Sequence, residues 1–315
     1  MHVLILAREL DELLELRAVA DQIGALEVET LVPKAMTNGE DLASLGLRRA
    51  YFLEGFDDIS PDGLKKIVID LVGKVEPSLV LGPSKKVFRE LFARVAHNLA
   101  SPCLTDCTSL EFSGGRLVVE RPFLGGGYVE RLAVKKLPAF LTIQMTGRRP
   151  KIRERNGPEK VELSKPSSED FSLRRVSVER VERGGADLAK ARIVVSVGRG
   201  FKRREDLKLA EELAQLLGAD LACSRPLASD LGWMPEEKHV GLSGKWISPQ
   251  LYIAIGISGQ VQHMVGVRNS RIIVAVNNDT SAPIHREADY SVPLDLYQFI
   301  PALITVLREK GVRAT

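Results

Sequence analysis

Repeated strand-loop-helix units between residues 191 and 315 constrain the fold of this chain more than any other feature. The apolar run Arg192–Val197 is followed by a Gly-Arg-Gly loop and then by Glu205–Gly218, whose leucine and alanine residues recur at helical spacing. The chain closes with the amphipathic segment Leu296–Lys310. Between them lie further short apolar runs, at Asp220–Cys223, Leu251–Gly256 and Arg271–Val276. This alternation predicts a doubly wound parallel sheet of Rossmann-like type.

The first half of the chain shows a similar alternation. Its apolar runs predict strands at Val3–Ala7, Val28–Val32 and Ser78–Leu81, and its helical spacings predict helices at Glu9–Ile23 and within Gly82–Ala100. Residues 114–134 combine alternating apolar residues with glycine turns, which is typical of added strands. We therefore expect a first α/β domain with a mostly parallel sheet, in which no catalytic constellation is apparent.

A densely charged segment separates the two halves. Between about residues 148 and 190, Arg, Lys and Glu mix with three prolines, and large apolar residues are few. We interpret this segment as a solvated linker. Val176–Glu182 alternates valine with charge, so an exposed edge strand is the alternative there. A chain of 315 residues exceeds the ~150 expected of one domain, and we predict an N-terminal α/β domain at 1–188, including the linker, and a second domain at 191–315.

Charge and cysteine content argue against several classes of protein. The 44 basic and 41 acidic residues are interleaved and leave a net charge of only +3, so no nucleic-acid footprint is indicated. Three cysteines are too few for a disulfide framework and suit a reducing compartment. No apolar run approaches the ~18 residues that span a bilayer, and Val3–Ala7 is too short for a signal-peptide core. We expect a cytoplasmic protein without membrane insertion.

Polar residues follow each predicted strand of the second domain. Arg199 follows the first strand, Ser224 and Arg225 the second, Ser258 the third, and Asn277, Asn278 and Asp279 the fourth. Ligands of such sheets bind beyond the carboxyl ends of the strands, so these residues should form one polar rim. A large ligand with many acceptors would suit it. A pyrophosphate would suit residues 256–260, where we expect Ser258 to cap a short helix whose first N–H groups favour anions.

Each motif is weak by itself. Gly198–Gly200 lacks the third glycine of the dinucleotide fingerprint, because Arg203 stands at that place, and a tight turn is the simpler explanation. The sequence around Ser258 resembles a nucleophile elbow, but Gln260 replaces its last glycine, which argues against a serine hydrolase. His263 lies on the helix face that would meet a ligand at the N-terminus, although a lone histidine is more often structural.

Taken together, the strings between residues 193 and 302 resemble the FAD domain of electron-transfer flavoprotein alpha subunits (the FixB family). They are VVSVGRG, ACSRP, HVGLSGKWISPQLYIAIGISGQVQHMVG, RIIVAVNND, APIHREADYSVPLDL and FIPAL, in that order. The first domain contributes only short pieces such as LTDCTSLE and RPFLGGG. The resemblance implies FAD as cofactor and electron transfer as function.

The resemblance also implies roles for individual residues. Arg199, Ser224 and Arg225 would flank the isoalloxazine, Ser243 would lie near the flavin ring nitrogens, and His263 would face the pyrimidine end. The phosphates and ribityl chain would be held by Ser258, Gly259, Gln260 and Gln262, and the adenosine half by Asn277, Asp295 and Leu296. Val240, Gly241, Leu242 and Val261 complete the expected cofactor-binding set.

Three positions depart from the family pattern around HVGLSGK. His239 and Leu242 stand where glutamines are common, and Ser243 stands where threonine is usual. Because the Leu242 side chain cannot hydrogen-bond, either its backbone makes the family contact or that contact is missing. His239 adds a group that titrates near neutrality, and we expect it to make flavin properties sensitive to pH.

The resemblance further implies a carrier without catalytic residues. The chain would form a heterodimer with an electron-transfer flavoprotein beta subunit, accept electrons from dehydrogenases and pass them to a quinone-linked or ferredoxin-type acceptor. One alternative is a subunit of a flavin-based bifurcating complex that uses NADH and two FAD. Another is an adenine-nucleotide binding module without redox activity, which the α/β pattern of the first domain permits.

Overall fold

The chain folds into two compact α/β units. The computed structural model describes residues 1–38, 40–113, 116–151, 157–164, 177, 188 and 191–311. The first unit comprises Met1–Phe123 and Tyr128–Glu179, and the second comprises Leu124–Gly127 and Arg180–Thr315. Each unit has its own sheets and its own apolar clusters. The α/β class predicted from the sequence is therefore confirmed.

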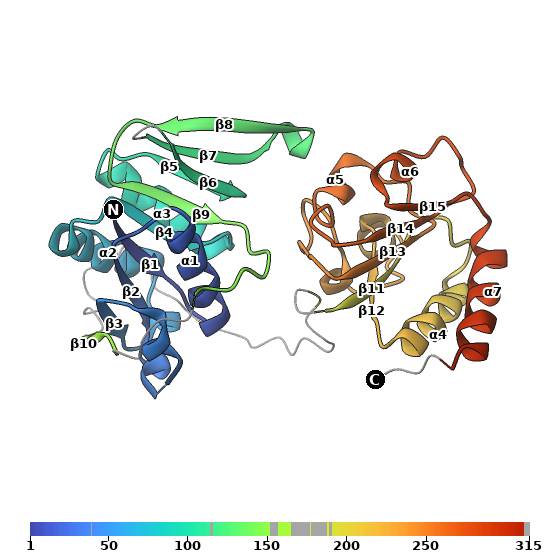
Figure 1. The fold of residues 1–315 in the computed structure, drawn as a ribbon, viewed down its shortest axis with the longest axis horizontal. Helices are drawn as coiled ribbons and strands as arrows, with labels where there is room; N and C mark the ends of the chain where they lie inside the picture. Colours follow the sequence, from blue (N-terminus) through green and yellow to red (C-terminus); the bar gives the residue numbers. More distant parts are fainter. Residues whose placement is uncertain are drawn as a thin grey trace. The chain divides into compact units, whose positions relative to one another are not determined.

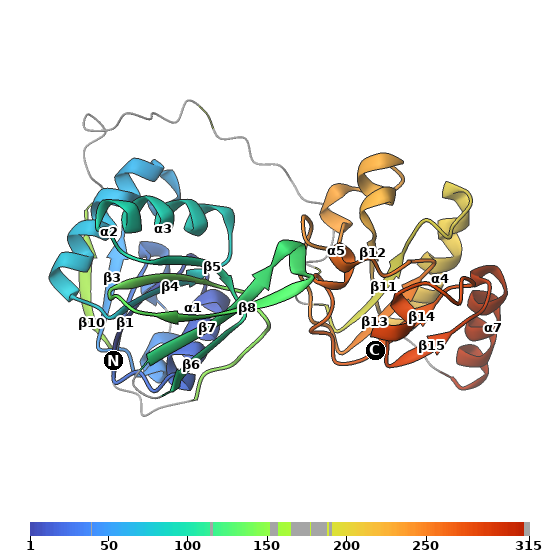
Figure 2. The same ribbon diagram turned by 90° about the horizontal axis from the view of Figure 1, so that it is seen from above.

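The first unit is built on a parallel sheet with helices on both faces. Its strands are β1 (His2–Leu6), β2 (Glu27–Pro33), β3 (Arg49–Leu53), β4 (Leu79–Pro83), β5 (Cys103–Cys107), β9 (Ala139–Ile143) and β10 (Glu159–Leu163). Its helices are α1 (Leu10–Gln22), α2 (Pro61–Val75) and α3 (Lys86–Asn98). The seven strands lie in the order β10-β3-β2-β1-β4-β9-β5, with every neighbouring pair parallel. Figures 1 and 2 show α1 on one face and α2 with α3 on the other.

Burial on both faces explains the unbroken apolar run at the start of the chain. Val3 and Ile5 belong to the apolar cluster that includes α1, whereas Leu4 and Leu6 belong to the cluster with α2 and α3. All four side chains are fully buried. Successive side chains of a strand point to opposite faces, so a strand covered on both sides is apolar throughout.

A second, smaller sheet packs in the same unit. It is antiparallel, with the order β6 (Ser109–Ser113), β7 (Arg116–Phe123) and β8 (Tyr128–Val134). Leu110, Leu117 and Val119 are buried in the cluster that also contains the α1 side chains. The added strands predicted from the glycine turns at residues 114–134 are thus present.

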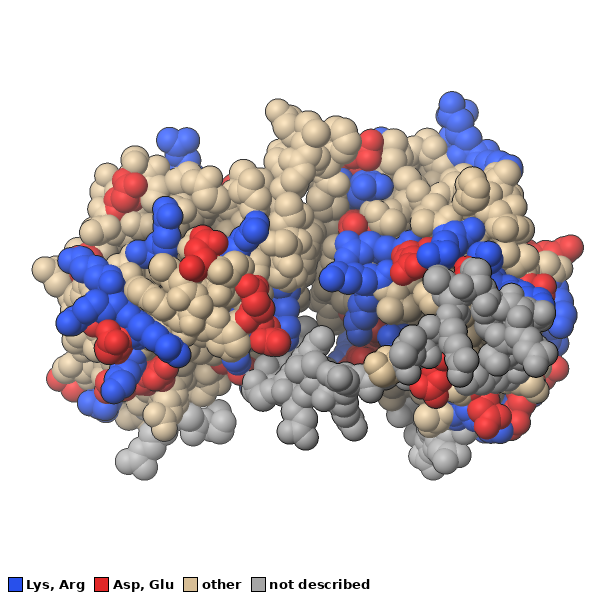
Figure 3. Space-filling view, turned by 180° about the vertical axis from the view of Figure 1, so that it is seen from behind, with Lys and Arg blue, Asp and Glu red and all other residues tan. Residues whose placement is uncertain are grey.

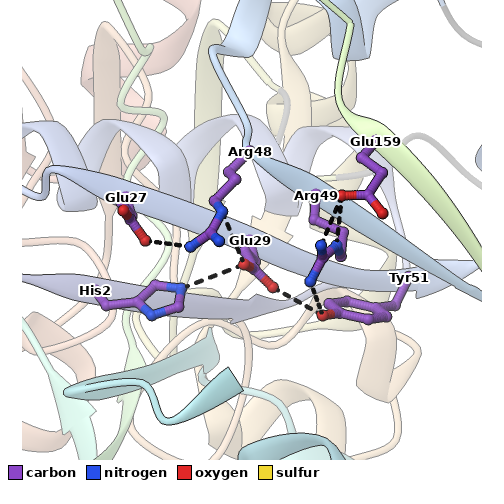
Figure 4. A network of polar contacts seen from close by, with 7 residues as sticks. All are labelled: His2, Glu27, Glu29, Arg48, Arg49, Tyr51 and Glu159. Carbon is purple, nitrogen blue, oxygen red and sulfur yellow. Dashed lines mark hydrogen bonds and ion pairs between the residues drawn. The ribbon is translucent and has the colours of Figure 1, made fainter. Parts of the chain in front are cut away.

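Strand β10 lies inside the charged segment that the sequence analysis interpreted as a linker. It pairs in parallel with β3, and the Arg49 guanidinium donates to Glu159 from Nε at 3.0 Å and Nη2 at 2.6 Å. Behind this pair, Tyr51 donates to the buried Glu29 carboxylate at 2.9 Å (Figure 4). An edge strand leaves most of its side chains in water, so its composition looks like that of a linker. The predicted alternative at 176–182 lies outside the described residues except for Ser177.

The second unit is a smaller parallel sheet. Its strands are β11 (Ile193–Val197), β12 (Asp220–Cys223), β13 (Leu251–Ile255), β14 (Ile273–Val276) and β15 (Tyr290–Val292), and its helices are α4 (Leu207–Leu217), α5 (Val261–Met264), α6 (Ile284–Glu287) and α7 (Leu296–Glu309). The order is β12-β11-β13-β14-β15, all parallel. Side chains of α4 and α7 cover one face, and those of α5 and α6 cover the other. The doubly wound sheet is confirmed, and strand β15 and helix α6 are among its short elements that were not predicted from the sequence.

Acidic and basic side chains are mixed on the surface. On the face drawn in Figure 3, acidic groups stand among the Lys and Arg side chains. Among the described residues, no helix combines the length and the apolar character needed to cross a lipid bilayer. In the same part of the chain, no three His, Cys, Asp or Glu side chains cluster in a way that could hold a metal ion.

Candidate functional site

A cleft of about 700 Å³ opens at the carboxyl ends of the strands of the second unit. Its wall comes from the loops that follow β11, β12, β13 and β14, together with the loop around residues 239–243. This is the edge at which α/β sheets bind ligands, because strand ends and helix starts meet there. Twelve of the residues predicted from the sequence line it: Arg199, Ser224, Arg225, Val240, Leu242, Ser243, Ser258, Gly259, Gln260, Gln262, His263 and Asn277.

The loops that contain Gly200 and Gly256 form the floor of the cleft, where their backbones are in direct contact. The Gly200 N–H donates to the Gly256 carbonyl at 2.9 Å, and Gly256 has a φ of +64°. A Cβ on Gly256 would lie 2.8 Å from the Gly200 Cα, which is closer than real Cβ contacts allow. Glycine is therefore required for the loops after β11 and β13 to meet. The Gly-Arg-Gly sequence follows from this contact, and it leaves Arg199 exposed at the cleft.

The start of α5 differs from the prediction. We expected Ser258 to cap this helix, but the cap position is Gln260, and no side chain makes a cap hydrogen bond. The reason is Gly259, whose φ of +77° turns the chain before the helix begins. The Ser258 carbonyl instead accepts the Ile284 N–H at 3.0 Å. Ser258, Gly259 and Gln260 still line the cleft, as a turn ahead of the helix.

Asn277 connects the loops that follow β13 and β14. Its Nδ2 donates to the Ile257 carbonyl at 2.9 Å, and its Oδ1 accepts the Asp279 N–H at 2.9 Å. The Asp279 carboxylate in turn accepts from the backbone and hydroxyl of Ser281, and this hydroxyl is the first cause that lowers the pKa of Asp279. Asn277 thus fixes the shape of this wall as well as lining it.

The loop from His239 to Lys245 is closed by its own backbone, because the Lys245 N–H donates to the His239 carbonyl at 2.9 Å. Two more backbone bonds attach the loop to its surroundings: the Val240 N–H donates to the Cys223 carbonyl at 3.0 Å, and the Leu242 N–H donates to the Gln262 carbonyl at 2.6 Å. The Leu242 backbone N–H is therefore already used within the protein. Gly241 packs behind the wall, where a Cβ would lie 2.9 Å from the Gln262 carbonyl oxygen, and this explains why it does not line the cleft.

His239 lies in the wall of the cleft and is buried. Burial lowers the pKa of its imidazole from 6.5, Glu236 opposes this, and the nearby Arg225 adds to it. The Glu236 carboxylate lies 3.9 Å from His239 Nδ1. The expected pH sensitivity of the cofactor stays a prediction, and the lowered pKa places its window below neutrality.

His263 lies in the same wall and is 8% exposed. Its Nε2 is 2.7 Å from the hydroxyl of Tyr252, whereas its Nδ1 is buried without a hydrogen-bond partner. Burial first, and His239 second, lower the pKa of the imidazole to about 4. The ring is therefore neutral at pH 7 and carries one unpaired polar atom, which is typical of a position completed by a ligand.

The other predicted residues lie outside the wall. Val261 is exposed on the short helix, and Asp295 caps α7 by accepting the Tyr297 N–H at 2.7 Å. Leu296 is 6% exposed and packs beneath the two glycine loops. Six further residues line the cleft without having been predicted to bind a cofactor: Gly200, Pro226, His239, Gly256, Ile257 and Asp279. Asp279 was predicted at the polar rim after the fourth strand, although not as a cofactor-binding residue, and it lines the cleft.

The lining suits an elongated, anionic and partly aromatic ligand such as FAD. Arg199 and Arg225 are exposed cations at the cleft, and Ser, Gln and Asn side chains supply further hydrogen-bonding groups. Pro226, Val240 and Ile257 add apolar surface. The unpartnered His263 Nδ1 and the glycine floor complete a cradle that these features fit.

Comparison with known proteins agrees with this geometry. Residues 187–268 match the family described as electron transfer flavoprotein FAD-binding domain, and residues 13–170 match the electron transfer flavoprotein domain. Protein FixB of Escherichia coli O157:H7 is 33% identical over 296 residues, which cover 92% of each chain. Protein FixB of Shigella flexneri has the same identity and coverage. The chain therefore belongs to the electron transfer flavoprotein alpha-subunit (FixB) family, and its second unit is the FAD-binding domain of that family.

Proposed function

We propose that this chain is the alpha subunit of a heterodimeric electron-transfer flavoprotein, which receives electrons from dehydrogenases and passes them to a quinone-linked or ferredoxin-type oxidoreductase. The observation that carries the proposal is the cleft, in which residues from four strand ends form one polar wall. Residues widely separated in the sequence meet there in the way that a dinucleotide cofactor requires.

The bound FAD would supply the redox chemistry, and the side chains would set its electrostatics. Reduction of a flavin builds negative charge near its pyrimidine edge, so cations and N–H donors there favour the reduced forms. Arg225 and His263 are the groups that we assign to this role, Arg225 as a cation and His263 as a neutral donor. Arg199 and Ser224 would flank the ring, and Ser243 would reach its nitrogens.

The remaining residues would hold the rest of the cofactor. Ser258, Gly259, Gln260 and Gln262 form the turn and first helical residues at the cleft, where backbone N–H groups lack acceptors within the helix and favour phosphate. Asn277 lies at the adjacent rim. Asp295 and Leu296 lie outside the wall of the cleft. They would contact the adenosine half of a cofactor that extends past this wall.

No side chain is assigned as nucleophile or general acid in this proposal. The chain binds and orients the cofactor, and electrons pass between proteins without a substrate bond being made or broken. A beta subunit would complete the cofactor platform. We place the complex in the cytoplasm, in keeping with the composition of the chain.

Coexpression tests the proposal directly. We expect the chain purified alone to retain FAD poorly, and the chain purified with its beta subunit to give a yellow complex with a flavin absorption spectrum. A colourless complex that holds only an adenine nucleotide would contradict the electron-carrier function, and full retention of FAD by the lone chain would contradict the need for a partner.

The number of flavins distinguishes the alternative of a bifurcating complex. A simple carrier is expected to hold one FAD per heterodimer, whereas a bifurcating complex holds two and is reduced by NADH. Extraction and quantification of the flavin, followed by NADH titration without a dehydrogenase, separates the two.

A further inference from the structure

The buried phenol of Tyr252 lies directly behind His263. Tyr252 is on β13, is 0% exposed, and places its hydroxyl 2.7 Å from His263 Nε2. The two rings are tilted by 42° with centroids 6.1 Å apart, so the contact runs through the hydroxyl rather than by stacking. One imidazole nitrogen is thus engaged inside the core, and only Nδ1 is left for any other partner.

We propose that Tyr252 is a positioning residue that holds His263 as the Nδ1–H tautomer, so that the imidazole offers a fixed N–H donor to a group bound in the cleft. This inference rests on the proposed function only for the identity of that group. The tautomer itself is a property of the protein without cofactor.

Hydrogen-bond direction supports this tautomer. Burial raises the pKa of Tyr252, so its hydroxyl keeps the proton. A buried hydroxyl must donate that proton to avoid a desolvation cost, and Nε2 is its hydrogen-bonded neighbour. A neutral imidazole that accepts at Nε2 carries its proton on Nδ1.

The other groups around His263 do not disturb this arrangement. His239 is the titratable neighbour that lowers the pKa of His263, and the Val240 backbone opposes that effect. The consequence is a neutral donor whose orientation is fixed before any cofactor binds, which avoids reorganisation on binding.

Nitrogen NMR of the cofactor-free chain, labelled with 15N in its five histidines, tests the proposal. His263→Gln identifies the His263 signals. In the wild-type protein we expect Nδ1 to give the shift of a protonated ring nitrogen and Nε2 that of an unprotonated one, with a scalar coupling from the Tyr252 hydroxyl proton to Nε2. In Tyr252→Phe, which removes only the hydroxyl, we expect this preference to be lost or reversed.

Tyr51→Phe is the matched control, because it also removes a buried phenol hydroxyl but in the first unit. It should leave the His263 signals unchanged. In the cofactor-loaded complex, Tyr252→Phe should lower the flavin midpoint potential and Tyr51→Phe should not.

A wild-type His263 protonated at Nε2 overturns the proposal, and so does a Tyr252→Phe variant with an unchanged tautomer. The wild-type measurement decides even if that variant fails to fold, because the coupling to the hydroxyl proton identifies the donor. Failure of the complex to bind FAD would contradict the proposed function instead, and it would leave the tautomer result standing.

Discussion

At the scale of single residues, the cleft combines an exposed cation with a neutral imidazole. Arg225 lies at the mouth of the cleft, whereas His263 is held in its wall by a hydrogen bond to Tyr252. The two groups act on a bound flavin by different means. The cation contributes charge that salt can screen, and the imidazole contributes a directed hydrogen bond in a drier place.

Replacement of Arg225 tests the cationic contribution. A charge-assisted hydrogen bond is worth ~1.5 to 3 kcal/mol, so Arg225→Gln should lower the one-electron flavin potential by roughly 60 to 130 mV. Spectroelectrochemical titration of the loaded complex measures this shift. Arg271→Gln is the control, since Arg271 is an exposed arginine of the same unit next to the amino end of β14. Equal shifts in the two variants would argue against a specific role.

The lowered pKa of His263 predicts a pH dependence of stability. Its pKa falls from 6.5 to about 4 on folding, so the unfolded chain binds the proton first as the pH drops. The neutral, buried His263 contributes about 3 kcal/mol to the free energy of unfolding. This contribution is present in full above about pH 6.5 and is lost as the pH falls towards 4. Urea unfolding of the second unit across this range should show a shallower pH slope in His263→Gln than in the exposed-site control His97→Gln. Equal slopes would refute the assignment.

At the scale of elements, glycine contacts between loops determine where the strand ends can meet. The loops after β11 and β13 approach so closely that neither Gly200 nor Gly256 has room for a Cβ. The sequence displays these glycines openly, but its motif lacks a third glycine and matches no standard fingerprint. Their role follows from the contact between the two loops, which are more than fifty residues apart along the chain.

Gly256→Ala should therefore destabilise the second unit more than an alanine at another left-handed glycine. Gly232 is the matched control, because its φ is +61° but a Cβ there meets nothing within 4 Å. Both substitutions cost ~1 to 2 kcal/mol for the backbone conformation, and Gly256→Ala should add ~1 to 3 kcal/mol for the overpacked contact. Chemical unfolding and FAD retention of both variants measure the difference. Similar losses would show that the loop contact is unimportant.

At the scale of the whole molecule, the chain holds two separate sets of apolar clusters. The clusters of the first unit extend to Val161 and Leu163, which pack against them partly buried, and those of the second begin at Leu188. Domains with separate cores can unfold separately, and a ligand stabilises the unit that binds it. The predicted division into domains at 1–188 and 191–315 stays a prediction, and Leu188 packs in a cluster of the second unit.

Calorimetry of two core variants tests this independence. Phe92 is fully buried and contacts Phe88 and Phe140 edge to face, so Phe92→Ala should cost ~3 to 5 kcal/mol in the first unit. Leu213 is fully buried in the second unit, where Leu213→Ala should cost ~2 to 5 kcal/mol. We expect two transitions, each lowered by one variant, and FAD should raise only the second. A single transition lowered by both variants would indicate one cooperative unit.

The sequence by itself determined the class of fold and most of the rim. Buried parallel strands leave continuous apolar runs, and polar residues directly after them must gather at one edge, which is why Arg199, Ser224, Ser258 and Asn277 could be predicted together. Strand β10 and the cap of α5 could not be predicted, because an edge strand looks like a linker and a left-handed glycine shifts the start of a helix. Only the tertiary structure decided which residues face the cleft, because that depends on contacts between distant loops. It also brought Tyr252 behind His263, because these residues lie on β13 and α5, which only the folded unit packs together.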